Sequence, residues 1–406
     1  LSSNLVQNGS FSQIGAEEVS NGNFSQIGAE EVTNGDFSNG STDWLISGGS
    51  EVTEQGVRIN NTITGANAFI KQSNSNFTTG KSFVLEYDVV ATNGKTLAIE
   101  QLSAITLNTS TIGNNRKLYF KWDTSSTGLV IKRLTTGTDV TITNISLKEV
   151  GQDWTLGTGW SIAEDKAISD GTSGNLYQSG IIVTGKQYKI QATVSDYVSG
   201  NVEVSAGAVP RGTMSANGTY TFYQTASSTI NFFIISNSFT GSITNISVKE
   251  VGQNWQEKSG VIVSVDSSGL VFDNSIGNAT AGAFQNIGLS DGKKYRMTAT
   301  MQLLTGASNG NFALQTSTAT GSGQSLVYLG ETLVVGGDAV TETFEFTPAL
   351  GDVSVQLSCS EPNATFKISN ISVIEITDNT DLPRINYEGF SYQDALGSEQ
   401  VVNGDF

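Results

Sequence analysis

Two segments each occur three times in this chain, and this repetition constrains its architecture more than any other feature. The opening segment follows a turn containing Gly-Lys and occupies residues 79–89, 184–194 and 291–301. The closing segment is built on Ile-Thr/Ser-Asn-Ile-Ser and occupies residues 142–150, 243–251 and 368–376. In both segments apolar residues alternate with polar ones, which is the pattern of a strand with one buried face. We therefore predict three similar β domains.

Short strands at roughly 8 to 12-residue spacing, with turn signals between them, predict an antiparallel sandwich for each domain. The fold class is all-β, with tandem β-sandwich (jelly-roll) domains preceded by a short-repeat β segment. The predicted divisions are the short repeats at 1–33, jelly roll 1 at 34–150, jelly roll 2 at 151–251, jelly roll 3 at 252–377, a linker at 378–398 and the start of a further, truncated domain at 399–406.

The spacing of these segments gives two further expectations. The third domain is longer than the others, which we assign to an insertion in the glycine-rich residues 305–323. The first two closing strands run directly into Gly151 and Gly252 without a linker. Neighbouring domains should therefore touch and form a stiff rod.

The motif Asn-Gly-x-Phe recurs every 13 residues near the N-terminus, at 8–11, 21–24 and 34–37. A unit of this size cannot bury a core alone and must stack on its neighbours or on another chain. We expect residues 5–33 to pack between the chains of a homo-oligomer. Each jelly roll should then stay folded when residues 1–33 are deleted.

Composition excludes several classes of function. Histidine is absent from the 406 residues, which removes the usual general base and the usual zinc ligand. The paired carboxylates Glu86 and Asp88 have no counterpart in the other two opening segments, and the single cysteine, Cys359, reads as a buried apolar residue. A formal charge of −17 disfavours nucleic acid as a partner. No segment reaches the roughly 18 to 20 apolar residues that span a bilayer. We predict no enzyme activity, no catalytic residue, no cofactor and no metal site.

Aromatic side chains are the remaining candidates for ligand contact, because sugar rings stack on Trp and Tyr. Trp122 and Tyr223 each lie 22 residues before the Asn of a closing segment, and we weigh a core position for Trp122 against a glycan contact. The other tryptophans lie at domain entries, where we expect them to plug the junctions between domains; they are Trp44, Trp154, Trp160 and Trp255.

Residues 31–40, Glu-Val-Thr-Asn-Gly-Asp-Phe-Ser-Asn-Gly, together with Trp44, resemble the opening of carbohydrate-binding-module-like jelly rolls. Residues 144–147 resemble the closing strand of that superfamily. The resemblance implies a jelly-roll fold and a structural calcium held by an acidic residue near the first and last strands. This sequence carries Asn144 and no Asp in that closing strand, which argues against calcium. Jelly rolls 2 and 3 lack the Asn-Gly-Asp-Phe opening.

Residues 381–387, Asp-Leu-Pro-Arg-Ile-Asn-Tyr, and the 13-residue tandem are similar to segments of bacteriophage tail-fibre and virion appendage proteins. This resemblance implies a non-enzymatic stalk on a virion. It also implies a homo-oligomer, expected to be a trimer, in contact with other virion proteins and with host surface glycans. Two alternatives remain open. One is a carbohydrate-binding module array of a secreted glycan-degrading enzyme, and the other is a bacterial surface adhesin.

Overall fold

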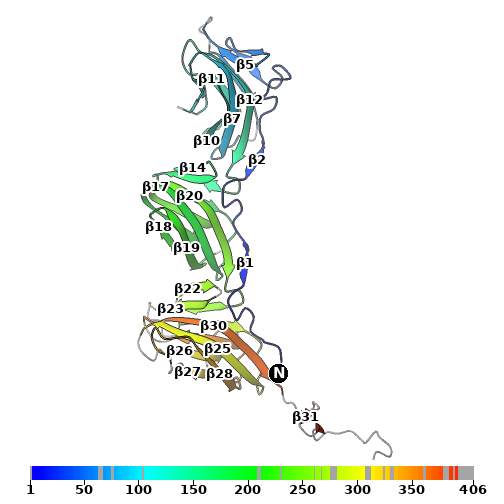
Figure 1. Ribbon diagram of the computed structural model, residues 1–406, viewed down its shortest axis with the longest axis vertical. Helices are drawn as coiled ribbons and strands as arrows, with labels where there is room; N and C mark the ends of the chain where they lie inside the picture. Colours follow the sequence, from blue (N-terminus) through cyan, green and yellow to red (C-terminus); the bar gives the residue numbers. More distant parts are fainter. Residues whose placement is uncertain are drawn as a thin grey trace, which may run out of the picture. The chain divides into compact units, whose positions relative to one another are not determined.

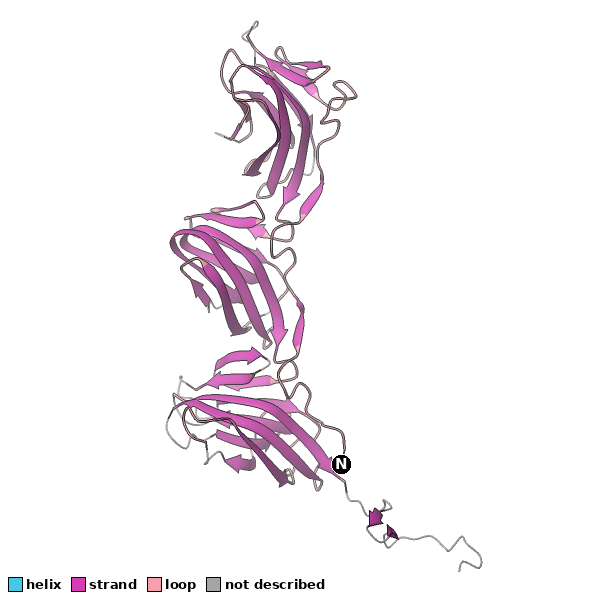
Figure 2. Cartoon of the chain, viewed as in Figure 1, coloured by secondary structure: helices cyan, strands magenta, loops and turns pink. Residues whose placement is uncertain are grey.

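The secondary structure of the chain is entirely β wherever the structure describes it (Figure 2). The computed structural model describes residues 2–62, 67–74, 77–102, 105–207, 212–228, 231–259, 261–266, 268–274, 281–306, 312–322, 325–329, 333–359, 363–377, 384–386 and 389–391. Within these ranges no helix has the length and apolar character needed to cross a membrane. Most of the predicted linker and all of the predicted truncated domain at 399–406 lie outside the described residues.

Jelly roll 1 consists of two antiparallel five-stranded sheets, with one further strand from the short repeats. The strand orders are β10-β7-β12-β5-β4 and β3-β6-β11-β8-β9. The strands are β3 (Leu45–Ser47), β4 (Glu51–Thr53), β5 (Gly56–Asn60), β6 (Phe69–Ser73), β7 (Ser82–Thr92), β8 (Leu97–Ile99), β9 (Thr106–Leu107), β10 (Gly113–Lys121), β11 (Gly128–Arg133) and β12 (Asp139–Val150). Alternate apolar residues, such as Leu85 on β7 and Ile142 on β12, are fully buried in its core.

Jelly roll 2 repeats this order, but two of its strands run through both layers. β17 (Gln187–Ala206) and β20 (Phe232–Val251) are 20 residues long, and register shifts interrupt their pairing around Ser199. The other strands are β13 (Thr155–Leu156), β14 (Trp160–Ala163), β15 (Lys166–Asp170), β16 (Gly174–Gln178), β18 (Gly212–Met214) and β19 (Gly218–Thr225). Strands β14, β15, β20, β17 and β19 thus correspond to β4, β5, β12, β7 and β10.

Jelly roll 3 has the same two sheets, in the orders β22-β23-β30-β25-β28 and β21-β24-β29-β26-β27. Its strands are β21 (Gln256–Ser259), β22 (Val261–Asp266), β23 (Gly269–Asp273), β24 (Ala281–Asn286), β25 (Lys294–Thr305), β26 (Phe312–Ser317), β27 (Ser325–Leu329), β28 (Val340–Phe346), β29 (Ser354–Cys359) and β30 (Thr365–Ile376). A separate pair, β31 (Arg384–Asn386) with β32 (Gly389–Ser391), follows it.

Two sequence predictions about the domains have clear outcomes. The three opening segments form β7, β17 and β25, and the three closing segments form the strands beside them, β12, β20 and β30. The predicted all-β jelly-roll fold is therefore confirmed. The predicted insertion at 305–323 differs from the structure, because it contains β26, which pairs with β29 as β8 pairs with β11.

The three 13-residue repeats do not form a unit of their own. We call them repeat 1 (residues 1–13), repeat 2 (residues 14–26) and repeat 3 (residues 27–39). Repeat 3 contributes β2 (Ile27–Glu30), which pairs with β12, and repeat 2 contributes β1 (Ile14–Glu17), which pairs with β20 (Figure 1). Repeat 1 lies on β30, where the amide of Leu5 donates to the carbonyl of Val373 at 2.8 Å.

Each repeat thus supplies the first segment of a different jelly roll, in reverse order along the chain. The described chain divides into residues 14–251 and a second unit made of residues 1–13 with residues 252–406. Jelly roll 2 therefore consists of repeat 2 and residues 151–251, with jelly roll 1 inserted between them. Jelly roll 3 consists of repeat 1 and residues 252–377. This differs from the contiguous boundaries expected from the sequence. Residues 5–33 contact jelly rolls of their own chain.

Candidate functional site

The same site occurs in all three jelly rolls. It is a groove along the closing strand (β12, β20 or β30), and it holds part of a repeat. The part held is the six-residue sequence Val-x-Asn-Gly-x-Phe, which we call the anchor motif. Its Val and Phe side chains are at most 6% exposed in all three copies; they are Val6, Phe11, Val19, Phe24, Val32 and Phe37. Burial of one such side chain stabilises the fold by about 1.5–3 kcal/mol, so each motif is held mainly by two apolar anchors.

A tryptophan covers the Phe of every anchor motif. The ring centroids are 5.4 Å apart for Phe11–Trp255, 5.3 Å for Phe24–Trp154 and 5.5 Å for Phe37–Trp44. These three tryptophans were predicted to plug the junctions between domains. In the structure each one packs on the repeat of its own jelly roll, and Trp154 also lines a surface cavity of about 550 Å³ shared with Thr78 and Ser82 of jelly roll 1, at the junction predicted for it. Their position at the domain entries follows from this contact, because the chain returns to the groove there.

The anchor motif needs its glycine because the backbone of the closing strand comes very close. A Cβ atom on Gly22 would overlap the carbonyl oxygen of Ile246, and Gly9 and Gly35 meet the corresponding oxygens of Ile371 and Ile145. The same pairs are joined by hydrogen bonds in the other direction, from the isoleucine amide to the glycine carbonyl, at 2.9–3.0 Å. The preceding Asn is left-handed in each copy, with φ of 48–50°, a conformation that Asn tolerates better than most residues.

A glutamine on the opposite sheet clamps the backbone of each repeat. In jelly roll 2 the amide of Ser20 donates to Oε1 of Gln178 at 3.1 Å, and Nε2 of Gln178 donates to the carbonyl of Ser20 at 2.6 Å. Gln72 makes the same reciprocal pair with Thr33, and Gln285 makes it with Gln7. The clamp satisfies a backbone donor and a backbone acceptor beside the buried Val, which is the requirement for burying a peptide group.

A carboxylate completes the contact in jelly rolls 1 and 2. Oε1 of Glu17 accepts a hydrogen bond from the amide of Val248, and its Oε2 accepts one from Oγ of Ser247, both at 2.6 Å. Glu30 makes the equivalent bonds to Leu147 and Ser146 in jelly roll 1. Repeat 1 has Asn4 at this position, and its Oδ1 accepts from the amide of Val373 at 2.9 Å.

From the sequence, Glu17 and Glu30 are interpreted as solvated charge, each paired with the next glutamate in its repeat, and the clamping glutamines are not identified. The signal for Glu17 was its constant place in the repeat, two residues before the buried Val and seven before the buried Phe. The glutamines carry no comparable local signal, because each lies on a strand distant in sequence from the repeat that it holds.

The two predicted glycan contacts do not form a site. Trp122 is fully buried among Phe77, Phe83 and Phe120, and its Nε1 donates to the carbonyl of Ser126 at 3.0 Å. Its side chain belongs to the core and presents no face to a sugar ring. The prediction that Trp122 contacts a glycan is therefore wrong, and the core position weighed for it is the observed one.

Tyr223 is half-buried on β19, and it is not the structural counterpart of Trp122. The amide of Trp122 donates to the carbonyl of Lys81, and the amide that donates to the equivalent Lys186 is that of Ala226. The shared distance to the closing Asn is therefore a coincidence of loop length. Trp160 is a core residue, 1% exposed and packed on Phe239, and it lies on β14, which contacts β7 and β10 of jelly roll 1 at the junction between the two domains.

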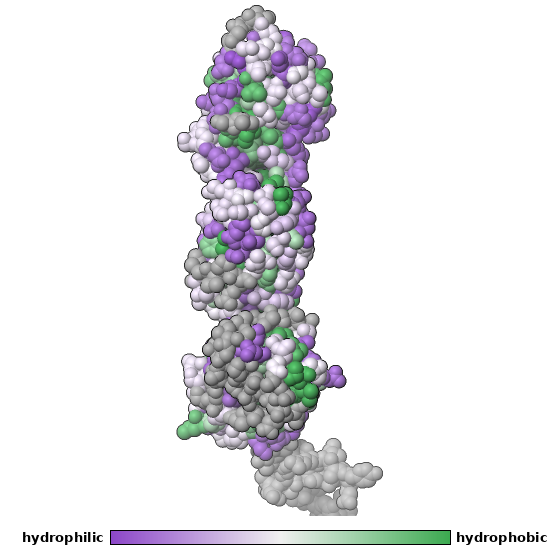
Figure 3. Space-filling model, turned by 90° about the vertical axis from the view of Figure 1, so that its left-hand side faces the viewer, coloured by the Kyte–Doolittle hydropathy of each residue, from purple (hydrophilic) through white to green (hydrophobic). Residues whose placement is uncertain are grey.

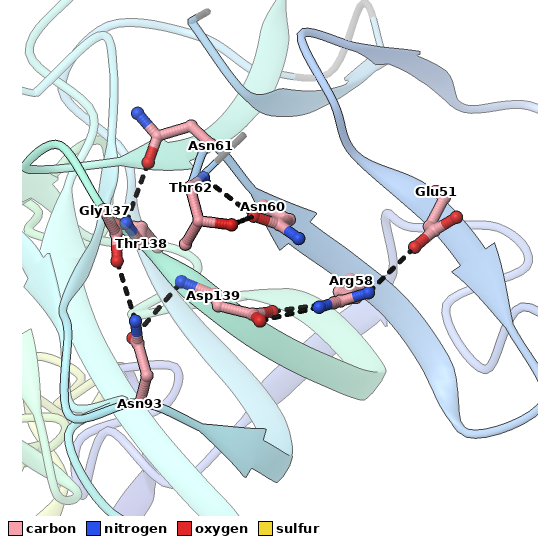
Figure 4. Close-up of polar contacts among 9 residues, drawn as sticks. All are labelled: Glu51, Arg58, Asn60, Asn61, Thr62, Asn93, Gly137, Thr138 and Asp139. Atoms are coloured by element: carbon pink, nitrogen blue, oxygen red, sulfur yellow. Dashed lines mark hydrogen bonds and ion pairs between the residues drawn. The ribbon is translucent and has the colours of Figure 1, made fainter. Parts of the chain in front are cut away.

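A second polar site lies at one edge of jelly roll 1, above β5 and β12 (Figure 4). Arg58 on β5 makes two hydrogen bonds of 2.7 Å with the carboxylate of Asp139 on β12 and an ion pair of 3.2 Å with Glu51. Arg58 and Asp139 line a surface cavity of about 590 Å³ together with polar residues, among them Asn93 and Thr141. The charged groups of Arg58, Asp139 and Glu51 are paired with one another, so we interpret this contact as one that holds neighbouring strands together. We call it the Arg58 brace.

The Arg58 brace predicts a pH dependence of jelly roll 1. Hydrogen bonds from Arg58 hold the pKa of Asp139 below its ordinary value. The unfolded chain therefore takes up a proton first as the pH falls, so this contribution to stability is present above the ordinary Asp pKa and is lost below it. We expect the protection factors of the β5 and β12 amides, which are corrected for the intrinsic slowing of exchange in acid, to fall between about pH 5 and pH 3 in the whole chain, and Asp139→Asn to reduce this fall. An unchanged acid response in Asp139→Asn would contradict this.

The outer surface offers little for ring stacking. Among the described residues, the large hydrophobic side chains that are exposed are all aliphatic, such as Leu45, Ile112 and Val198. On the face of residues 14–251 seen in Figure 3, hydrophobic residues lie in small groups among polar ones. No group of three or more Cys, Asp or Glu side chains suited to a metal ion occurs in the described part of the chain.

Comparisons with known proteins give structural similarity only. No family model and no curated protein matches the sequence. The N-terminal CBM22-1–CBM22-2 tandem domain of Paenibacillus barcinonensis Xyn10C matches at 9% identity and a TM-score of 0.25, covering 56% of this chain and 94% of that one. A triple jelly-roll protein from the turret assembly of an archaeal virus matches at 17% identity and a TM-score of 0.20, covering 82% and 89%. A chain of Sulfolobus Turreted Icosahedral Virus matches at 15% identity and a TM-score of 0.20, with the same coverage.

Proposed function

We propose that this chain is a non-enzymatic structural array whose role is to hold other parts of an assembly apart, as the stalk of a virion appendage. The observation that carries the proposal is the nested connectivity. Jelly roll 1 joins jelly roll 2 through two backbone crossings, at 26–27 and at 150–151, and the unit containing both joins jelly roll 3 through two more, at 13–14 and at 251–252. Two covalent connections restrict bending and twisting at a junction more than a single linker does.

Several features of the residues fit a spacer better than a receptor. The tryptophans that might have bound a glycan are committed to cores or to the anchor motifs. The formal charge of −17 keeps such arrays soluble and apart from one another. In this role the chain acts without a cofactor and is secured to other virion proteins, and it assembles with copies of itself, as a trimer in the resemblance noted above.

The stiffness of the junction between jelly rolls 1 and 2 is tested in residues 14–251 by moving repeat 2. In the rearranged order, residues 27–251 come first and residues 14–26 follow through a short glycine turn, because Ile14 pairs with Val251. Each jelly roll keeps its repeat, but only the crossing at 150–151 remains at the junction. Dyes are placed by Leu134→Cys in jelly roll 1 and Val198→Cys in jelly roll 2, both exposed, and the native Cys359 lies outside these residues.

We expect single-molecule energy transfer between these dyes to give a narrow distance distribution in the native order. The rearranged order should give a distribution at least about twofold wider, because a single short linker leaves most rotations free. Equal widths would show that the nested crossings do not stiffen the junction and would remove the main support for a spacer.

Two other functions share the same fold and are separated by location and binding. A carbohydrate-binding module array would be secreted with a glycan-degrading enzyme, and an adhesin would lie on a bacterial surface. Antibodies against residues 1–377 should label released virus particles if the stalk proposal holds. Label on cells, or strong retention of residues 1–377 by polysaccharide gels, would favour the alternatives. The fragment must begin at residue 1, because jelly rolls 2 and 3 need their repeats.

A further inference from the structure

Residues 399–406, Glu-Gln-Val-Val-Asn-Gly-Asp-Phe, carry the anchor motif a fourth time. The segment matches repeat 3 at every position that makes a groove contact there. Glu399 matches Glu30, Val401 matches Val32, and Asn403, Gly404 and Phe406 match Asn34, Gly35 and Phe37. The three grooves of the described chain already hold the three repeats, so this fourth copy is an additional ligand for a groove of this design.

The groove of jelly roll 3 holds repeat 1, which lacks two polar contacts that the other repeats make. Repeat 1 has Asn4 where the other repeats have Glu, and its single oxygen serves the amides of Val373 and Val6. Nε1 of Trp255 is buried without a hydrogen-bond partner among the described residues, whereas Nε1 of Trp154 donates to the carbonyl of Asn21 at 3.1 Å. A segment that has Glu at the position of Asn4 would add a charge-assisted hydrogen bond to the hydroxyl of Ser372, as Glu17 does to Ser247.

The fourth copy is also tethered close to this groove. The groove runs along β30, which ends at Ile376, and 22 residues separate Ile376 from Glu399. A chain of that length spans up to about 70 Å, far more than a return along its own strand requires. Repeat 1 runs antiparallel to β30, with Ser2 beside Glu375 and Leu5 beside Val373. A segment that returns from the end of β30 approaches in the same direction.

We propose that residues 399–406 compete with residues 4–11 for the groove of jelly roll 3 in the same chain. Binding is by strand addition, with Val401 and Phe406 as anchors, Gly404 against Ile371, and Glu399 on the amide of Val373 and the hydroxyl of Ser372. Short tethers give both segments a millimolar effective concentration, so their intrinsic fit decides which is bound. When residues 399–406 are bound, repeat 1 is released from β30.

The fit is measured first with peptides of equal length, residues 397–406 and residues 2–11, both acetylated and amidated. The receptor is residues 1–391 with Phe11→Ala, which weakens the resident repeat. We expect the 397–406 peptide to bind about tenfold tighter, because its carboxylate makes two charge-assisted bonds. Glu399→Gln should remove most of that advantage. Gly404→Ala should abolish binding, because its Cβ would overlap the carbonyl of Ile371 as one on Gly9 would.

Competition in the native molecule is measured by hydrogen exchange at the amides of Leu5 and Gln7, which donate to Val373 and Gln285 of the groove, and of Phe11, which donates to Asn8 within the bound repeat. We expect these amides to exchange at least about threefold faster in residues 1–406 than in residues 1–391, with Gly404→Ala in the whole chain restoring the slow rate. This readout needs no weakened repeat, so it stands even if the Phe11→Ala chain fails to fold.

Three results would overturn the proposal. The first is a 397–406 peptide that fails to bind where the 2–11 peptide binds. The second is equal exchange in the two chain lengths. The third is an exchange difference that grows with protein concentration, which would assign the ligand to a second copy of the chain instead of the same one.

Discussion

Residues 151–251 alone, without repeat 2, should lose most of the stability of jelly roll 2. The missing segment buries Val19 and Phe24, which together contribute about 3–6 kcal/mol. A domain of this size is stable by only about 5–15 kcal/mol. The C-terminal half of β20 would also lose β1 and expose unpaired backbone, which favours aggregation. This reverses the expectation from the sequence that every jelly roll stays folded without residues 1–33.

Residues 14–26 joined directly to residues 151–251 provide the matched control. The two ends lie close together, because Oδ1 of Asn21 accepts from the amide of Gln26 and its Nδ2 donates to the carbonyl of Gln152 at 3.1 Å. One or two glycines should bridge them. We expect the joined chain to unfold cooperatively in urea, with a midpoint well above that of residues 151–251. Equal midpoints would mean that repeat 2 is an accessory to the domain and not its first segment.

The parts of the fold that could be predicted from the sequence depend on local patterns. Residues 184–194 and 243–251 alternate with period 2 and are bounded by turns, so each is recognisable as a strand from its own residues. Their repetition predicts three similar units, and the structure adds that the two strands pair within each unit. The buried position of Cys359 and the core alternative weighed for Trp122 rest on the same local periodicity, and both side chains are fully buried.

The assignment of the repeats could not be made in this way, because it depends on contacts between distant residues. Residues 12–19 and 25–32 are identical, so nothing in their own sequence says which domain each will join. The sequence signal for this assignment was a motif that two of the jelly rolls lack. Jelly rolls 2 and 3 start at Gly-Gln-x-Trp and lack the Asn-Gly-x-Phe that precedes Trp44 in jelly roll 1, while two unassigned copies of that motif stand upstream.

The candidate glycan contacts failed for a related reason. Trp122 and Tyr223 were matched by counting back from a closing Asn, which assumes that the intervening loops have equal lengths. The hydrogen-bond register matches Trp122 with Ala226 instead. The third unit illustrates the same problem, since a glycine-rich composition concealed the six-residue strand β26.

Phe24→Ala should destabilise jelly roll 2 by about 3–5 kcal/mol, the range for deleting a buried aromatic side chain. Phe24 is 1% exposed and lies against Trp154, which is also buried and in turn contacts Phe232 of β20. Removal of the ring leaves a cavity between these two side chains. The backbone is held on both sides, by the Gly22–Ile246 hydrogen bond and the Gln178 clamp, so it cannot collapse to fill the cavity.

Because repeat 2 is separated in sequence from the rest of jelly roll 2, the strands that Phe24→Ala destabilises are as informative as the size of the loss in stability. Phe24 lies 127 residues before the start of the main segment of jelly roll 2 and immediately before jelly roll 1. If repeat 2 belongs to jelly roll 2, hydrogen exchange in the whole chain should accelerate on β17 and β20 while β7 and β12 keep their protection. Ile14→Ala in the same repeat is the matched control, because Ile14 is 49% exposed, and it should change stability by less than about 0.5 kcal/mol. Acceleration confined to jelly roll 1, or equal effects of the two substitutions, would contradict the assignment of repeat 2 to the groove of jelly roll 2.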